Sequence, residues 1–112
     1  MSKILMILEN VDDKNLLISE LRKITKKPVL ALKNSFDEKT PFYEGTLFLN
    51  DHEEISLSIM KILNLLNKLK AEVTILEVED HVKFKDLSSS KNYKIDEVIL
   101  KNILNSWQQI TV

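Results

Sequence analysis

Four side chains in the second half of the chain could supply oxygen and imidazole ligands to a metal ion: Glu77, Glu79, Asp80 and His81. Successive side chains of a regular strand point to opposite faces, so Glu77 and Glu79 share one face and Asp80 lies on the other. That alternation scatters the ligands, and the other histidine, His52, lies at the far end of a predicted helix. We therefore predict neither a metal site nor a cofactor. The acidic group is interpreted as a solvated strand end or as an anionic patch that binds a partner protein.

Two further groups of residues have the chemistry of acid–base or nucleophilic catalysis. Asp12 and Asp13 are adjacent carboxylates, but capping of the next helix explains them and no partner base is evident. The three consecutive serines at 88–90 have no adjacent base and no nucleophile-elbow sequence. The sequence therefore predicts no catalytic residue, and we expect a protein that is not an enzyme.

The densest group of cations is Arg22, Lys23, Lys26 and Lys27. A surface for single-stranded nucleic acid interleaves aromatic side chains with its cations, and none lie nearby. Cations are favoured at the C-terminal end of a helix, so a solvated helix end is the first interpretation. The alternative is a docking patch for an acidic partner, and nucleic acid is not an expected partner.

The composition limits the classes of protein to which this chain can belong. A chain of 112 residues with 44% hydrophobic residues can form one domain with its own core. Its 16 basic and 17 acidic side chains nearly balance, it has no cysteine, and a single glycine leaves no phosphate-binding loop. No apolar run reaches the roughly 20 residues of a membrane span, and no signal-peptide pattern is present. We expect a soluble cytoplasmic protein that does not bind a membrane.

Hydrophobic periodicity predicts the elements that carry these residues. Residues 3–9 form a continuous apolar run that is typical of a strand buried on both faces. Two short amphipathic helices follow, with a break at Pro28, and they lead into a strand at 42–49. Gly45 inside this strand indicates a bulge or a closely packed neighbour.

The second half of the chain begins with its clearest helix. Asp51 and Glu54 have the spacing of a capping box, and apolar residues follow at steps of four and three. A third strand is predicted at 72–79. The last helix carries an apolar stripe, and there Trp107 is predicted to pack in the core or to anchor the helix on a partner. That stripe consists of Ile95, Ile99, Ile103, Trp107 and Ile110.

These elements predict an α+β fold in the order β-α-α-β-α-β, with a three-stranded sheet covered by helices on one face, plus a C-terminal helix. We predict an α+β domain at residues 1–85, a loop at 86–94, and a C-terminal helix at 95–110. That helix packs on the domain or on a partner. The chain is then a monomer, or a homodimer through this helix.

Four short stretches match a known pattern in the right order and at nearly the right spacing: Leu21-Arg22-Lys23-Ile24-Thr25, Val29 with Leu32-Lys33, Phe42-Tyr43-Glu44-Gly45 and Ala71-Glu72-Val73-Thr74-Ile75. On these stretches, residues 16–79 resemble the C-terminal domain of the bacterial ribosomal stalk protein, a fold shared with the N-degron adaptor of the Clp protease. The resemblance implies a small scaffold that binds other proteins without doing chemistry.

The chain departs from the stalk pattern at the helix hairpin that contacts translational GTPases. Lys26, Lys27 and Pro28 stand where the stalk domain has glycine and leucine, whereas Lys33 keeps a comparable basic position. We therefore expect a protein-binding domain with a different task, a small inhibitor or immunity-type protein that blocks a partner such as a toxin. An adaptor or ribosome-associated binding domain is the alternative, and a small enzyme or ligand-binding protein with an unrecognised site is the second. The predicted protein-binding residues are Lys23, Lys26, Lys27, Lys33, Glu77, Glu79, Asp80 and Trp107.

Overall fold

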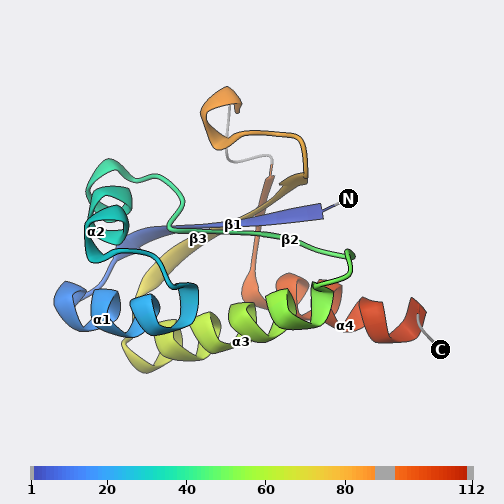
Figure 1. Cartoon of the computed structure of the whole chain (residues 1–112), viewed down its shortest axis with the longest axis horizontal. Coiled ribbons are helices and arrows are strands. Elements are labelled where there is room, and N and C mark those ends of the chain that lie inside the picture. Colours follow the sequence, from blue (N-terminus) through green and yellow to red (C-terminus); the bar gives the residue numbers. More distant parts are fainter. Residues whose placement is uncertain (1, 88–92, 111–112) are drawn as a thin grey trace.

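The computed structural model of this chain describes residues 2–87 and 93–110, and in the last helix it describes side chains as far as Ser106. The fold is α+β, which confirms the predicted class (Figure 1). In chain order the described elements are β1 (Ser2–Asn10), α1 (Lys14–Thr25), α2 (Val29–Glu38), β2 (Tyr43–Thr46), α3 (His52–Lys68), β3 (Glu72–Glu79), the 3-10 turn η1 (Phe84–Asp86), β4 (Lys94–Ile95) and α4 (Glu97–Ile110).

The sheet has four strands in the order β2-β1-β3-β4, and every neighbouring pair is antiparallel. β1 lies between β2 and β3 and is antiparallel to both, so β2 and β3 are parallel to each other. α3 connects these two strands. The predicted three-stranded sheet is wrong, since Lys94 and Ile95 pair with Leu76 and Ile75. The predicted order accordingly lacks β4 and η1. Two residues are too few for an alternating pattern, so periodicity could not reveal this strand.

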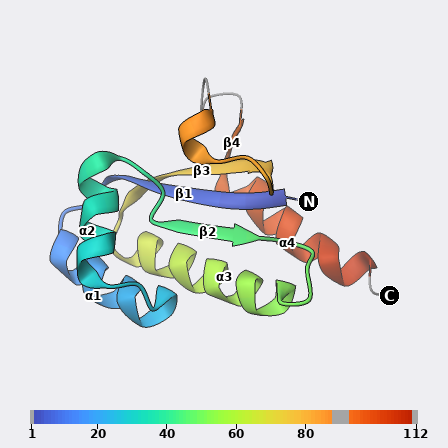
Figure 2. The same cartoon turned by 45° about the horizontal axis from the view of Figure 1, so that its top comes forward.

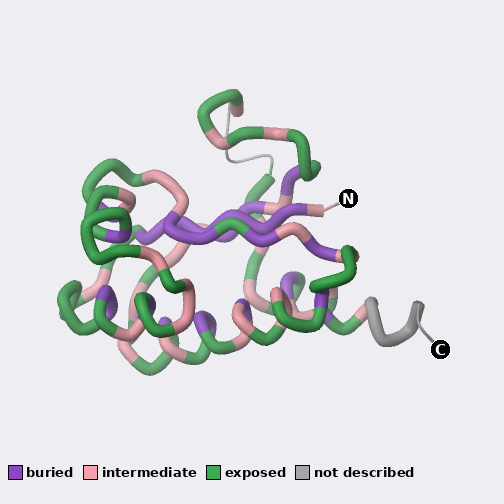
Figure 3. The backbone as a smooth tube through the Cα atoms, in the orientation of Figure 1, coloured by how far each residue is buried: buried purple, intermediate pink, exposed green. Residues whose placement is uncertain are grey.

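β1 is buried on both faces, as its apolar run predicts. Alternate residues of β1 pack either toward the helices or toward the opposite face of the sheet. Figures 1 and 2 show α1, α3 and α4 along one face, with the segment that follows β3 on the other. β1 is buried at residues 3–8 and exposed at its last two residues. Figure 3 shows this buried stretch, together with helices that are buried mainly on the sides facing the sheet. The helix side holds Ile4, Met6 and Leu8, and the opposite side holds Leu5 and Ile7.

A second, smaller core lies on the sheet face away from the helices. The segment after β3 covers it with Val82, Phe84 and Leu87. Lys3 is buried beneath this segment, and its ammonium donates to the carbonyl of Val82. A charged group buried without a partner would be costly, so this bond both satisfies the ammonium and holds the segment against the sheet.

α3 packs its apolar stripe on the sheet, and Gly45 of β2 faces the start of this helix. A Cβ at Gly45 would lie 2.9 Å from Cγ2 of Ile55 and 2.9 Å from the hydroxyl oxygen of Tyr43. The close neighbour predicted at this glycine is therefore confirmed. The capping box is wrong, because Asp51 precedes the helix but its carboxylate makes no capping hydrogen bond. Its backbone (φ −97°, ψ 17°) lacks the extended conformation that turns a capping side chain over the first turn.

α4 packs on the domain through Leu100 and Leu104, which are buried in the main core. The predicted stripe is right in part, because Ile95 and Ile103 pack against this core, whereas Ile99 is 44% exposed. Asp96 caps the helix, because its Oδ1 accepts from the N–H of Ile99 at 2.8 Å. The predicted stripe and the stripe through Leu100 and Leu104 are adjacent on the helix and both apolar, so the sequence alone does not show which one is buried. No helix in the described part of the chain is long and apolar enough to cross a membrane.

Candidate functional site

α1 and α2 bring together side chains that lie far apart in the sequence. Asp13 starts α1, and its Oδ1 accepts from the N–H of Leu16 at 3.0 Å. Pro28 has φ −61° and ψ 150° immediately before α2, an extended conformation that turns the chain from one helix into the next. The two helices bury Leu17, Ile18, Leu21, Leu32 and Phe36, and leave their polar faces outward.

A groove of 570 Å³ runs between these outward faces. Four cationic side chains line it over an apolar floor, and we call it the basic groove. Since the charges come from both helices, the packing of α1 on α2 creates the groove. Its lining residues are Lys14, Arg22, Lys23 and Lys33, with Ile18 and Val29 on the floor and Asn15 and Ser19 beside them.

The groove keeps an excess of positive charge. Lys23 lies 3.3 Å from Oε1 of Glu20, and Lys14 lies 3.8 Å from Oδ1 of Asp37. Both pairs are solvent-exposed, so each contributes little to stability and can be exchanged for a better partner. Within the described residues, Arg22 and Lys33 have no carboxylate in ion-pair contact. An anionic group entering the groove would therefore meet two cations that no described acidic side chain neutralises.

The other two lysines of the predicted basic patch do not line the groove. Lys26 ends α1 in the left-handed conformation (φ 63°), and its N–H donates to the carbonyl of Arg22 at 2.9 Å. Lys27 donates from Nζ to the carbonyl of Phe42 at 3.0 Å, which ties the connection between the helices to the start of β2. The structure thus brings Lys23 and Lys33 together, and gives Lys26 and Lys27 contacts within the fold.

The acidic candidates lie at the other end of the molecule. Glu77 and Glu79 lie opposite Ile4 and Ser2 in the sheet, and so share one face. Asp80 follows the strand, and its Oδ1 is 3.8 Å from Nδ1 of the exposed His81. No group of three or more histidine, cysteine or acidic side chains within the described ranges is arranged to hold a metal ion.

Trp107 lies in α4, but its side chain is outside the described residues. Its predicted role as a core residue or partner anchor therefore stays a prediction.

His52 and Ser56 form a pair that the sequence-based prediction missed. The imidazole Nε2 is 3.0 Å from the hydroxyl oxygen of Ser56, and Nδ1 accepts from the backbone N–H of Phe48 at 2.9 Å. Because Nδ1 is an acceptor, the neutral ring carries its proton on Nε2 and donates it to Ser56. That tautomer cannot remove a proton from the serine through Nε2, so the contact does not activate a nucleophile.

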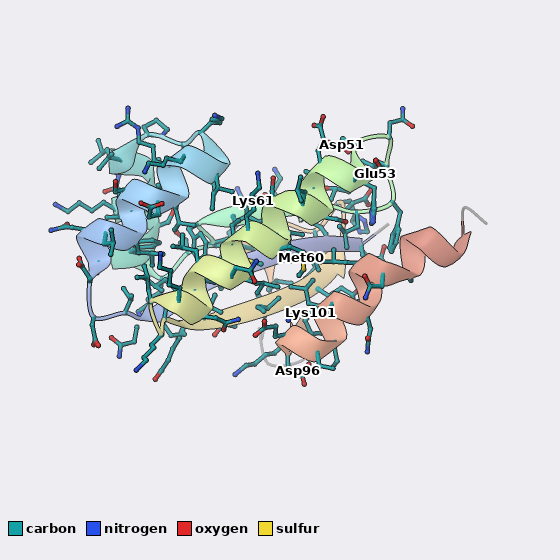
Figure 4. All side chains as sticks on the ribbon, turned by 90° about the horizontal axis from the view of Figure 1, so that it is seen from below. Asp51, Glu53, Met60, Lys61, Asp96 and Lys101 are labelled. Atoms are coloured by element: carbon teal, nitrogen blue, oxygen red, sulfur yellow. The ribbon has the colours of Figure 1, made fainter. Side chains whose placement is uncertain are left out.

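This pair borders a hollow of 430 Å³ between α3 and α4, where Met60 points into the space between the two helices (Figure 4). A histidine followed four residues later by a serine in a predicted helix was the available signal, because such residues are neighbours on the helix surface.

Tyr43 has a buried hydroxyl whose oxygen makes no hydrogen bond to any described residue. Burial, together with the negative charge of Asp51, raises the pKa of Tyr43 to about 12. The phenol therefore stays protonated at neutral pH, and its hydroxyl is a buried polar group that the fold tolerates without a partner.

No protein-family model matches the chain, and neither a curated protein nor a solved structure is significantly similar to it. The resemblance to the ribosomal stalk domain therefore stays a prediction. The functional proposal rests on the residues of the basic groove.

Proposed function

We propose that this chain is a protein-binding domain that acts without catalysis, as a small inhibitor of the immunity type that blocks a partner protein by covering part of its surface. The observation that carries the proposal is the basic groove, in which four cations surround an apolar floor. Such a surface is complementary to an acidic segment that also carries an apolar side chain.

The surroundings of the groove favour a protein partner. Val29 is 44% exposed on its floor, and Leu30, the next residue of α2, is 67% exposed. Apolar side chains at the surface supply the contact area that surface ion pairs lack. Among the described residues no aromatic side chain lines the groove, whereas the bases of a single-stranded nucleic acid would stack on aromatic rings. The expected ligand is therefore an acidic, partly apolar stretch of another protein.

Binding alone does not distinguish an inhibitor from an adaptor, because both would use the same groove. An inhibitor abolishes the activity of the protein it covers, whereas an adaptor leaves that activity intact and changes where it acts. A toxin gene immediately beside the gene for this chain would support the inhibitor of immunity type.

The experiment compares two charge-reversal variants of the full chain as affinity baits in an extract of the source cells. Arg22→Glu with Lys33→Glu reverses the two unpaired cations of the groove. Lys61→Glu with Lys68→Glu reverses two exposed cations of α3 and is the matched control. We expect a protein that binds the wild type and the control but not the groove variant, and whose own activity falls when the wild type is added.

Three results would contradict the proposal. The first is a partner that binds all three baits equally, which would place the interface elsewhere. The second is a nucleic acid as the only captured molecule. The third is a partner whose activity is unchanged at saturating wild-type protein. This result would favour an adaptor over an inhibitor.

A further inference from the structure

β3 has an outer edge whose pairing is incomplete, and the register of the sheet shows where. The N–H of Leu47 donates to the carbonyl of Ser2 at 2.8 Å, so even-numbered residues of β1 direct their backbone groups toward β2. Because this direction alternates along an antiparallel strand, odd-numbered residues of β1 face β3. Ile7 lies opposite Thr74, so the backbone groups of Thr74 face β1 and those of Val73 face outward.

The outward-facing backbone groups of β3 meet β4 at only one end of β3. Ile75, the next outward-facing residue after Val73, lies opposite Ile95. In the same register Val73 would lie opposite Glu97, but the chain has already entered α4 at that residue. Within the described residues, the N–H and carbonyl of Val73 therefore have no strand partner. An unpaired edge of this kind is a template for an added strand.

This edge is recessed in a hollow of 640 Å³. Residues of α3 and the start of α4 form its walls, and Figures 1 and 2 show these two helices on the same side of the sheet. The apolar lining consists of Leu63, Leu66, Ala71, Val73, Ile75, Ile95 and Ile99, and the polar lining of Asn67, Lys94, Asp96 and Glu97.

Two carboxylates, Asp96 and Glu97, lie at the rim together with the ammonium group of Lys94. Asp96, labelled at the start of α4 in Figure 4, caps the helix through Oδ1. Glu97 accepts through Oε1 from Nδ2 of Asn67 at 3.0 Å and from Nζ of Lys101 at 3.2 Å. The hydrogen bond from Asn67 lowers the pKa of Glu97, and Lys101 lowers it further against the opposing effect of burial. The second oxygen of each carboxylate makes no hydrogen bond or ion pair within the described residues.

We infer that this hollow, which we call the edge hollow, binds a short extended peptide segment of another protein. The segment adds a strand to β3 by pairing its backbone with the N–H and carbonyl of Val73. One apolar side chain occupies the lining formed by α3 and β4, and a flanking lysine or arginine lies beside Asp96 and Glu97. The edge hollow is separate from the basic groove, and its ligand has the opposite charge.

The test uses the full chain labelled with ¹⁵N and the peptide acetyl-Thr-Lys-Leu-Lys-Thr-amide as probe. In the free protein we expect the amide of Val73 to exchange with solvent far faster than that of Thr74. At about 1 mM peptide, the range of a weak single-strand contact, we expect shifts at residues 71–75 and 95–97 and slower exchange at Val73. The same peptide with an N-methylated leucine lacks the donor for the Val73 carbonyl and should cause no such change.

Two sets of protein variants separate the charge from the backbone pairing. Asp96→Asn with Glu97→Gln keeps an N-cap and an acceptor but removes both charges, so we expect a folded protein that binds the probe about fivefold more weakly at low salt. Val73→Pro removes an N–H that faces outward, and it should fold but lose the probe. Thr74→Pro removes an N–H that faces β1, and it should fail to fold.

Several outcomes overturn the inference. An amide of Val73 as protected as that of Thr74 would show that its N–H is already bonded. The absence of shifts around Val73 at about 1 mM probe, or equal shifts with the N-methylated peptide, would exclude strand addition. Shifts confined to α1 and α2 would assign the probe to the basic groove.

Discussion

The backbone N–H of Phe48 donates to Nδ1 of His52 at 2.9 Å, and the rings of the same two residues stack with centroids 5.1 Å apart and planes 12° apart. Phe48 has a positive φ of 65°, and the N–H of His52 donates in turn to the carbonyl of Leu49 at 3.0 Å. A single buried side chain thus closes the turn between β2 and α3. The side-chain contact that orders the start of α3 therefore comes from His52 and not from the capping box predicted at Asp51.

Replacing His52 by alanine should destabilise the fold by about 2–3 kcal/mol, because the N–H of Phe48 loses its acceptor and a buried ring is removed. His52→Asn keeps an acceptor near Nδ1 and should recover part of this loss. Ser56→Ala, which removes only the contact at Nε2, should cost about 1 kcal/mol or less. Urea unfolding measures all three, and equal losses for the alanine variants at positions 52 and 56 would contradict this account of the turn.

The unpartnered hydroxyl of Tyr43 predicts a pH dependence. The pKa of about 12 in the folded state lies above the ordinary value of 10.0, so the folded state holds this proton more tightly than the unfolded state does. The resulting stabilisation is fully present below pH 10 and is lost as the pH rises through about 12. Tyr43→Phe removes this titration and the buried oxygen together. We expect the variant to be as stable as the wild type, or slightly more stable, at pH 8.

Unfolding of both proteins at pH 8 and pH 11 gives the comparison for Tyr43. The wild type should lose stability relative to Tyr43→Phe between these two values. A difference that stays constant with pH would mean that the phenol is not desolvated. A large loss of stability in the variant at pH 8 would mean that the hydroxyl has a partner.

Lys26 and Lys39 both end a helix with a positive φ, of 63° and 57°, but they differ in what their side chains do. The ammonium of Lys39 donates to the carbonyl of Glu9 at 2.6 Å, whereas that of Lys26 makes no hydrogen bond to a described residue. Lys26→Gly should therefore stabilise the fold by about 0.5–1 kcal/mol, since glycine adopts this conformation without strain. Lys39→Gly should gain less or lose stability, as thermal unfolding of the two variants can show.

The register of α4 can be tested with neighbouring substitutions. Leu100 is fully buried, so Leu100→Ala should destabilise the fold by about 2–4 kcal/mol. Ile99 is 44% exposed, and Ile99→Ala should cost about 1 kcal/mol or less. A larger loss at Ile99 than at Leu100 in urea unfolding would restore the stripe predicted from the sequence.

These elements also show which parts of the fold could be predicted from the sequence alone. The apolar run of β1 and the stripe of α3 predict their own burial, because many residues in each agree on one period. The buried face of α4 was predicted only in part, because two adjacent apolar stripes lie on one helix. β4 was not predicted, because two residues are too few to show a period. The turn at His52 depends on the positive φ of Phe48, which no local pattern indicates.

Part of the candidate site could be predicted from the sequence. Lys23 belongs to a visible run of cations, and the resemblance singled out Lys33. Lys14 begins the same helix nine positions before Lys23, and the packing of α1 on α2 brings Lys33 to the same groove. Lys26 and Lys27 belong to the same run, but the turn between the helices uses them for its own hydrogen bonds.

The central place of β1 governs how a newly made chain can fold. β1 is synthesised before the strands on either side of it, and the last of their residues, Glu79, lies 69 positions beyond the end of β1 at Asn10 (79 − 10). Until that point its apolar run has no complete sheet to enter, and such long-range pairing is slow to form. The stretch that is most deeply enclosed in the finished protein is thus the longest exposed during synthesis, which makes it the segment that a chaperone would have most reason to shield.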